Sequence, residues 1–335
     1  MFDYQQPKQL LQACPAYRQS PLNRVRYREQ TVLVKDESNR MGLGSFKALG
    51  GFYALARLIA QQSEKETGQK VAAEAYMSAK MQKIAHTLTF VCASAGNHGL
   101  AVAAGAKVFG ARARIYLAET VPETFARRLR DTGAEVVRSG LDYDESMAAA
   151  IEDACQTGAI HLCDSSWHGY TEIPRLVMEG YTVIAEEMRQ NFEQDNTWPT
   201  HVYIQAGVGG LAAAITYMIR LNWRVQPHIS IVEPELAPCL GQSIRRGKIS
   251  TVSGAASAMG RLDCKTPSLL ALDILRRQAD SFVTVSDEEA LTAASLSGKL
   301  GIKTTASGAA GFAALIKDLP EHNSLPLVIV TEQQL

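Results

Sequence analysis

Short runs of β-branched and other apolar residues alternate with longer segments of helical periodicity along most of the chain. Nine such runs predict strands, and helical segments fit between nearly all of them. This alternation is typical of βαβ units, in which helices cover the faces of a parallel sheet, so we predict an α/β fold. The predicted strands are residues 31–34, 88–92, 114–117, 135–138, 160–162, 201–204, 228–232, 282–285 and 327–330.

One helix-to-strand unit can be followed residue by residue. Residues 123–130 have helical character, and Thr132 and Gly133 follow them as a glycine-type helix stop before the strand at 135–138. Residues 61–70 are polar and predict a solvated loop or the end of a helix. The chain has no internal repeat and no Pro/Gly/Ser-rich linker, so domain boundaries must be inferred from topology.

Composition and charge narrow the possible classes of protein. Apolar residues make up 46% of the 335 residues, and 34 Lys and Arg balance 34 Asp and Glu. This balance argues against a disordered chain and against a basic nucleic-acid-binding protein. The apolar stretch 211–219 is much shorter than the roughly 18 residues that a membrane span needs. The first residues lack a basic flank followed by an apolar run, so we expect no secretory signal and a cytoplasmic protein.

The six cysteines are scattered, without a C-x-x-C pair or histidines at metal-ligand spacing. We expect them to be small buried side chains in a reducing compartment, and we predict neither a disulfide nor a metal site. They are Cys14, Cys92, Cys155, Cys163, Cys239 and Cys264.

A strand end, a glycine-bearing turn and an apolar helix meet in residues 35–51. Lys47 lies in the first turn of that helix, and Phe46, Leu49 and Tyr53 are its apolar neighbours at helical spacings. Packed surroundings and the positive end of the helix dipole both disfavour the ammonium form, so we expect a lowered pKa for Lys47. Such a lysine suits a Schiff base with an aldehyde cofactor. The alternative is an ordinary surface lysine near a helix start.

A second candidate is the glycine-rich segment 205–211, which lies between a predicted strand and a helix predicted over 211–220. Gly207, Gly209 and Gly210 let the backbone approach an anion, and the amides of the turn and helix start can bind a phosphate. The segment lacks both the G-x-G-x-x-G spacing of dinucleotide sites and a Walker lysine, so a small monophosphate is the better ligand. A tight turn is the structural alternative.

A third candidate lies in residues 92–101, where a strand runs into a loop and then a helix of small residues. The helix amides and the Ser94 hydroxyl can hold a substrate carboxylate, which makes Ser94, Ala95 and Gly96 the predicted substrate-binding loop. Asn97 can donate its side-chain amide to a ring oxygen. The alternative is that Ser94 or Asn97 is simply the N-cap of the helix.

In this order, the three segments resemble the fold type II pyridoxal-phosphate enzymes of the tryptophan-synthase-β-like superfamily. The resemblance is nearest to the diaminopropionate ammonia-lyase and threonine dehydratase-like branch, and it runs from Ser20-Pro21-Leu22 to the last strand. Its motifs are K-D-E-S and F-K-x-L-G-G around Lys47, G-N-H-G at 96–99, D-x-x-W-x-G-Y-x-x-I-P from Asp164, and V-E-P at 232–234. The D-x-x-W block is specific to that branch.

The resemblance implies pyridoxal 5'-phosphate as the cofactor and gives each motif a role. Lys47 resembles the lysine that binds the cofactor aldehyde, and Asn97 resembles the partner of its phenolic oxygen. Asp164 corresponds to a catalytic base, and it also follows the predicted strand 160–162, at the sheet edge where α/β proteins bind ligands. Its alternative role is a helix or loop cap. Thr331 resembles the hydroxyl residue that faces the pyridine nitrogen. The residues that resemble the phosphate loop are Gly207, Val208, Gly209 and Gly210.

The resemblance further implies a β-elimination. A small amino acid such as 2,3-diaminopropionate, serine or a threonine-like compound would lose its β-substituent and yield a keto acid and ammonia. Lys47 or Asp164 would remove the α-proton, a contribution of about 10²–10⁴-fold in rate. One alternative is β-replacement by an external nucleophile, as in cysteine-synthase relatives. Another is a degenerate binding protein, because Ala95 and Ala306 stand where the branch usually has acidic residues.

The resemblance also implies the architecture. We expect two domains with twisted, mainly parallel sheets flanked by helices, and the cofactor in the cleft between them. Residues 89–190 form the predicted small, mobile substrate domain, and residues 1–88 with 191–335 form the predicted large cofactor-binding domain. We expect a homodimer by analogy, a small amino acid as substrate, and neither nucleic acid nor a membrane as a partner.

Overall fold

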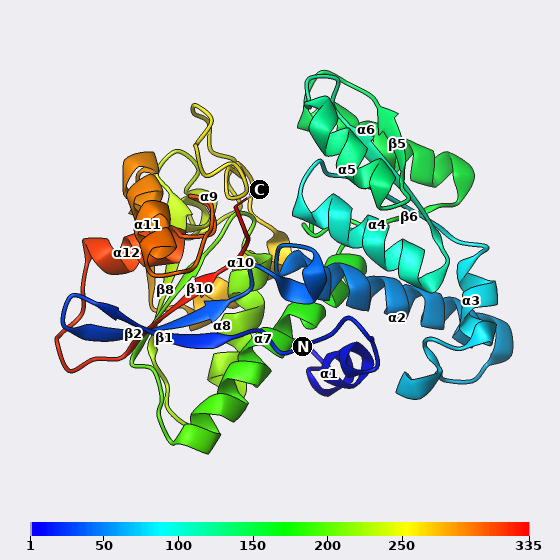
Figure 1. Ribbon diagram of the computed structural model, residues 1–335. Coiled ribbons are helices and arrows are strands. Elements are labelled where there is room, and N and C mark those ends of the chain that lie inside the picture. The colour runs from blue at the N-terminus through cyan, green and yellow to red at the C-terminus, as the bar shows by residue number, and fades with distance from the viewer. Residues whose placement is uncertain (1, 335) are drawn as a thin grey trace.

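The computed structural model describes residues 2–334, which form two mainly parallel sheets with helices on their faces (Figure 1). In the six-stranded sheet the order is β1-β2-β10-β7-β8-β9, with β1 antiparallel to β2 and the other neighbours parallel. Its strands are β1 (Leu22–Tyr27), β2 (Gln30–Asp36), β7 (His201–Gln205), β8 (His228–Pro234), β9 (Ser281–Val285) and β10 (Pro326–Val330). The parallel four-stranded sheet has the order β5-β4-β3-β6 and contains β3 (Thr89–Ala93), β4 (Arg112–Leu117), β5 (Glu135–Arg138) and β6 (Ile160–His161).

The predicted α/β class is confirmed, and all nine predicted strands are present with small differences at their ends. The apolar pattern does not predict β1, which pairs with β2 at the edge of its sheet. Arg24 and Arg26 of this strand are exposed, and Val25 and Tyr27 are partly buried against the core. An edge strand with one partly buried face therefore has too weak an apolar signal to be read from the sequence.

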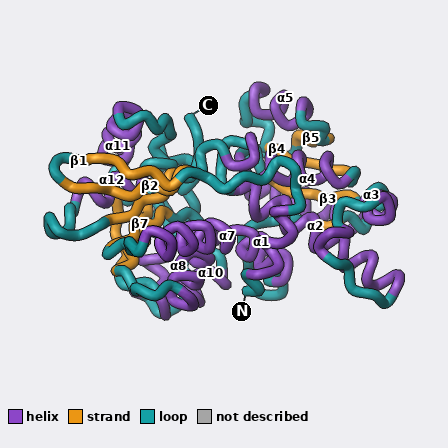
Figure 2. The backbone as a smooth tube through the Cα atoms, turned by 60° about the horizontal axis from the view of Figure 1, so that its bottom comes forward, coloured by secondary structure: helices purple, strands orange, loops and turns teal. Residues whose placement is uncertain are grey.

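The helices cover both faces of the six-stranded sheet, with α7, α8 and α10 on one side and α11 and α12 on the other (Figure 2). The predicted helix 123–130 is confirmed as α5, and the polar segment 61–70 contains the end of α2, which stops at Gly68. The helices are α1 (Gln5–Gln12), α2 (Lys47–Thr67), α3 (Ala79–Ala85), α4 (Asn97–Phe109), α5 (Glu123–Asp131), α6 (Tyr143–Thr157), α7 (Glu172–Asp195), α8 (Gly210–Asn222), α9 (Cys239–Arg245), α10 (Leu269–Gln278), α11 (Asp287–Lys299) and α12 (Ala310–Lys317), with 3₁₀ turns at Arg40–Gly42 and Ala73–Ala75.

Helix α2 joins the two sheet regions because it packs against both α4 and α7. Glycines allow these close approaches. A Cβ atom on Gly180 would lie 2.6 Å from the carbonyl oxygen of Leu49, and one on Gly51 would lie 2.8 Å from the Cβ of Ala101. A larger side chain at either glycine would separate the helices, so the small residues fix the position of the helix that begins with Lys47.

The predicted domain boundary at residue 190 stays a prediction. The four strands of the smaller sheet all lie within residues 89–161, and α7 packs against α2 and α8. Within residues 2–334, no helix combines the length and the apolar character needed to cross a membrane.

The cysteines differ in part from the prediction that all are buried. Cys155 is exposed, because it lies on the outer side of α6 near its end. Cys264 is partly exposed and lies beside Gly207, where a Cβ atom would be 2.9 Å from its Sγ. The four buried cysteines are Cys14, Cys92, Cys163 and Cys239.

A buried ionic cluster ties the end of β2 to α7. Lys35 Nζ lies 2.5 Å from Glu187 Oε2, and the Arg40 guanidinium lies 2.7 Å from Glu37 and 2.8 Å from Glu187. All four side chains are at most 3% exposed. Each charge is therefore compensated by a neighbour rather than by water, which lets these four side chains lie inside the protein at the start of the connection from β2 to Lys47.

We predict that Arg40→Met destabilises the protein by about 3–5 kcal/mol, because Glu37 and Glu187 lose their guanidinium while they stay buried. Denaturant unfolding measures the change. The matched control is Arg276→Met, which removes an exposed ion pair with Asp273 and should cost less than about 1 kcal/mol. Equal losses in the two variants would contradict the importance of the cluster.

Candidate active site

The predicted site residues all lie near the carboxyl ends of parallel strands, where open α/β sheets bind ligands. Each strand end delivers one group into a loop or a helix start. Lys47 follows β2 through a short turn, Asn97 follows β3, Asp164 follows β6, Gly207 to Gly210 follow β7, and Thr331 follows β10.

The structure brings Lys47 and Asp164 into direct contact, although they are far apart in the sequence. Lys47 is the first residue of α2, and its Nζ donates to Oδ2 of Asp164. The two side chains are 22% and 18% exposed. The rings of Phe46 and Tyr181 lie 5.2 and 5.9 Å from Nζ and complete an aromatic wall. A basic nitrogen and a carboxylate thus share one largely dry position.

The expected lowering of the Lys47 pKa is wrong. Burial is the largest single influence and disfavours the ammonium, but the charge of Asp164, its hydrogen bond to Lys47 and the neighbouring Tyr181 together outweigh burial, so the pKa of Lys47 is raised. For Asp164, burial is the largest single influence and favours the neutral acid, but the charge and hydrogen bond of Lys47, together with His98, outweigh it and lower the pKa of the carboxyl. The sequence prediction failed because it could not place a carboxylate from residue 164 against residue 47.

The residues around Asp164 hold its loop in shape. Trp167 and Tyr170 of the D-x-x-W block stack with ring centroids 4.4 Å apart. The Tyr170 hydroxyl donates to the carbonyl of His161 at 2.6 Å and accepts from the backbone N–H of Cys163 at 3.0 Å. The block therefore closes the turn that presents Asp164.

His98 is buried behind the pair, and its Nε2 lies 2.9 Å from the carbonyl oxygen of Leu162. Burial lowers the pKa of His98. Its hydrogen bond to Leu162 places the ring against the strand end that leads to Asp164.

The glycine-rich segment forms an open cradle at the start of α8. Gly209 has φ +101°, a conformation that suits glycine, and among residues 2–334 no side chain caps the helix. The amides of the first helical turn are therefore available to an anion. A Cβ atom on Gly210 would lie 3.8 Å from the carbonyl oxygen of Asp164 and 3.9 Å from the Tyr181 ring. The cradle thus lies next to the Lys47–Asp164 pair.

The loop of Ser94, Ala95 and Gly96 joins β3 to α4. Gly96 is the N-cap, and within residues 2–334 no side chain caps α4, so the alternative that Ser94 or Asn97 caps the helix is wrong. The Ser94 hydroxyl instead accepts from the Gly96 N–H at 3.3 Å. The amides at the start of α4 remain free to bind a carboxylate.

Asn97 and Thr331 lie in this same region. Asn97 Nδ2 donates to Oε2 of Glu332, and the Thr331 hydroxyl accepts from Gln205 Nε2 at 3.2 Å. The Thr331 carbonyl accepts from the N–H of Phe46, which connects the end of β10 to the residue before Lys47.

Three residues of the site were not found by the sequence analysis. Glu332 is buried and accepts from the Thr305 hydroxyl at 2.5 Å. Arg261 comes from a long connection between α9 and α10 that has no motif. The buried hydroxyl of Tyr181 has no hydrogen-bond partner among residues 2–334. The adjacency of Glu332 to Thr331 is the one usable signal in the sequence, because a buried helical tyrosine looks like an ordinary core residue.

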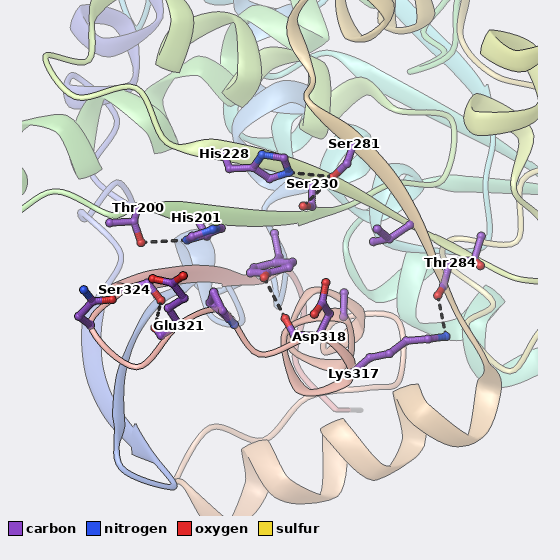
Figure 3. A pocket seen from close by; sticks show the side chains of 15 residues that line it. Thr200, His201, His228, Ser230, Ser281, Thr284, Lys317, Asp318, Glu321 and Ser324 are labelled. Atoms are coloured by element: carbon purple, nitrogen blue, oxygen red, sulfur yellow. Dashed lines mark hydrogen bonds between the residues drawn. The ribbon is translucent and has the colours of Figure 1, made fainter.

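A separate cavity of about 950 Å³ lies near the amino ends of β7, β8 and β9, beside the connection from α12 to β10 (Figure 3). His201 and His228 are paired across β7 and β8 in its wall, with ring centroids 5.9 Å apart, and Lys317 and Asp318 lie across from them. Because Lys47 and Asp164 lie at the carboxyl ends of the strands, this cavity is distinct from the candidate active site.

The site residues fit pyridoxal 5'-phosphate. Lys47 Nζ can bind its aldehyde, the glycine cradle can bind its phosphate, and Asn97 and Thr331 can bind its ring. The partnerless Tyr181 hydroxyl adds a polar group beside the cradle. The fold and this arrangement of residues are those of fold type II enzymes, which use pyridoxal phosphate.

Comparisons with known proteins agree with this class. A family model described as pyridoxal-phosphate dependent enzyme matches residues 14–331. The chain belongs to this family, and it is an enzyme of the ammonia-lyase branch. The diaminopropionate ammonia-lyase of Escherichia coli strain K12 is 33% identical over 290 residues, which cover 84% of this chain and 72% of that protein.

Other relatives support the same assignment. The L-threonine ammonia-lyase of Geobacter sulfurreducens is 31% identical over 229 residues, which cover 68% of this chain and 54% of that protein. The crystal structure of selenomethionine-labelled holo diaminopropionate ammonia-lyase from Escherichia coli superposes with a TM-score of 0.85 and 30% identity, over 99% of this chain and 90% of that one. The same enzyme in complex with D-serine gives a TM-score of 0.82 and 29% identity, with the same coverage.

We predict that Lys47→Ala prevents covalent attachment of the cofactor. Borohydride reduction followed by peptide mass spectrometry should find the cofactor on the Lys47 peptide of the wild type and on no peptide of the variant. The exposed Lys80→Ala is the matched control and should keep the adduct. An adduct that persists on another lysine would show that Lys47 is not the attachment site.

Proposed function

We propose that the chain removes the β-substituent and the amino group from a small amino acid and releases a keto acid and ammonia. The observation that carries this proposal is the partly buried contact between Lys47 and Asp164, beside the glycine cradle and the loop at the start of α4. The relatives named for 2,3-diaminopropionate and threonine support a small amino acid as substrate, and the D-serine complex supports serine-like compounds.

Different residues of the site would bind the cofactor and the substrate. The amides of Gly207 to Gly210 would hold the cofactor phosphate, with Asn97 and Thr331 against its ring. The loop of Ser94, Ala95 and Gly96 would hold the substrate carboxylate through the start of α4. When bound, pyridoxal phosphate supplies the electron sink for the substrate α carbon.

Lys47 and Asp164 would move the protons. While Lys47 carries its proton, it keeps Asp164 ionised. Once the Lys47 nitrogen is engaged and uncharged, its attraction no longer offsets the burial of Asp164, so the affinity of the carboxylate for a proton rises. Asp164 is then suited to accept a proton, and Lys47 can exchange one at the substrate α carbon when its amine is free. The partial burial of both groups limits their contact with water.

β-Replacement would share the first half of this pathway. Keto acid production that stays constant when a thiol is added supports elimination, whereas a thiol-dependent loss of keto acid with formation of a new amino acid supports replacement. The homodimer and the cytoplasmic location remain predictions from the sequence.

We predict that Asp164→Asn lowers keto acid formation by about 10²–10⁴-fold, because the variant lacks the buried proton acceptor. Cofactor content, measured from absorbance after denaturation in alkali, should stay near the wild-type value. Asp144→Asn, at an exposed position on α6, is the control and should keep full activity. Unchanged turnover in Asp164→Asn would remove Asp164 from the reaction.

A further inference from the structure

Arg261 reaches from the connection between α9 and α10 to the predicted substrate loop. A Cβ atom on Gly96 would overlap Arg261 Nη1, so the guanidinium lies directly against this loop. A Cβ atom on Gly207 would lie 3.3 Å from the Arg261 carbonyl oxygen, so the same residue also borders the phosphate cradle. The side chain is 34% exposed, so it is not fully covered by the rest of the protein.

A second arginine lies beside it. The Arg261 guanidinium lies over the ring of Phe125 at 5.7 Å, and Arg128 lies one turn further along the same side of α5. Arg128 is half-buried, and its pKa is lowered by burial and by the like charge of Arg261. Arg261 therefore lies against the side of α5 that carries Phe125 and Arg128, close enough for its charge to act on Arg128.

These positive charges are poorly compensated. Within residues 2–334, neither guanidinium donates a hydrogen bond, and Arg128 forms no ion pair. The ion pair of Arg261 is a long one, 3.8 Å from Nε to Glu332 Oε2, and Glu332 is also bound by Asn97 and Thr305. The Asp164 carboxylate is neutralised by Lys47. One positive charge therefore remains in excess, and a partly buried cation pair favours an anion between its members.

We propose that Arg128 and Arg261 bind an anionic group on the β carbon of the substrate. The start of α4 already offers amides for the α-carboxylate, so the arginines are left for a second anion. The planar guanidinium matches a carboxylate or a phosphate through paired hydrogen bonds. The preferred substrate is therefore an amino acid that carries a β-carboxylate or a β-phosphate ester. This inference rests on the proposed elimination and narrows its substrate class.

A phosphate ester and a carboxylate on the β carbon both allow a balanced elimination. In O-phosphoserine, the α C–H bond breaks, the proton goes to Lys47 or Asp164, and phosphate leaves the β carbon with the C–O electron pair. One water is consumed overall, and pyruvate, ammonia and phosphate are released. In 3-hydroxyaspartate, the hydroxyl leaves as water, the β-carboxylate stays, and a second water yields oxaloacetate and ammonia. Neither route needs an oxidant or a reductant.

The first test measures kcat/KM of the wild-type holoenzyme with O-phospho-L-serine, 3-hydroxyaspartate, L-serine and 2,3-diaminopropionate. We expect at least one anionic substrate to exceed serine and diaminopropionate by about tenfold or more. The two anionic compounds distinguish a phosphate from a carboxylate. A preference for diaminopropionate or serine would overturn the inference while leaving the elimination intact.

The second test uses Arg261→Gln and Arg128→Gln, with exposed Arg127→Gln as the matched control on the same helix. In each test variant, kcat/KM for the preferred anionic substrate should fall about 10- to 100-fold more than kcat/KM for serine. The control should match the wild type with every substrate. An equal loss for all substrates in the test variants would instead assign the arginines to the α-carboxylate and overturn the inference.

A binding experiment separates this inference from the proposed function. Spectral titration of the wild-type holoenzyme compares L-aspartate with its neutral analogue L-asparagine, neither of which needs to react. We expect aspartate to bind about tenfold or more tightly, and Arg261→Gln to remove the difference. If no substrate yields a keto acid, the elimination fails, but a retained preference for aspartate still supports the anion site. Equal binding of the two ligands contradicts it.

Discussion

The contact between the Lys47 ammonium and the Asp164 carboxylate is the interaction on which the site depends. It joins a helix that begins after the six-stranded sheet to a loop that follows the four-stranded sheet. Two partly dehydrated charges stabilise a fold poorly, because the cost of removing them from water offsets much of their attraction. The contact instead contributes to function, because it holds an acid and a base together where the carboxyl ends of both sheets meet.

The surrounding structure explains how this contact is held. Close packing of α2 on α4 and α7 fixes the helix that carries Lys47, and the ionic cluster of Lys35, Arg40 and Glu187 fixes the turn before it. The stack of Trp167 on Tyr170 shapes the loop of Asp164 from the other side. The positions of Lys47 and Asp164 therefore depend on packing beyond their own segments of the chain. Changes in helix packing far from the chemistry would therefore reach the reacting groups.

The sequence predicts those features that repeat or that stand in a motif. The strands with a strong apolar signal and the glycine cradle are examples, because strand periodicity and helix-start amides are local properties. The edge strand β1 is not predicted from the sequence, because its formation depends partly on pairing with β2. The raised pKa of Lys47 is not predicted from the sequence, because it depends on Asp164, which lies 117 positions away in the chain. The roles of Arg261 and Glu332 cannot be predicted from the sequence for the same reason, because they depend on neighbours that are brought together only in the folded chain.

The most direct measurement of the central pair is the pH titration of Lys47 Nζ in the cofactor-free protein, followed by ¹⁵N NMR in the wild type and in Asp164→Asn. In the wild type we predict that Lys47 keeps its proton above the ordinary pKa of a lysine, since the charge and hydrogen bond of Asp164, with the help of Tyr181, outweigh burial. In the variant, burial is no longer offset by Asp164, and the pKa should fall below that ordinary value. Identical titration of Lys47 in the two proteins would contradict the pairing on which the site is built.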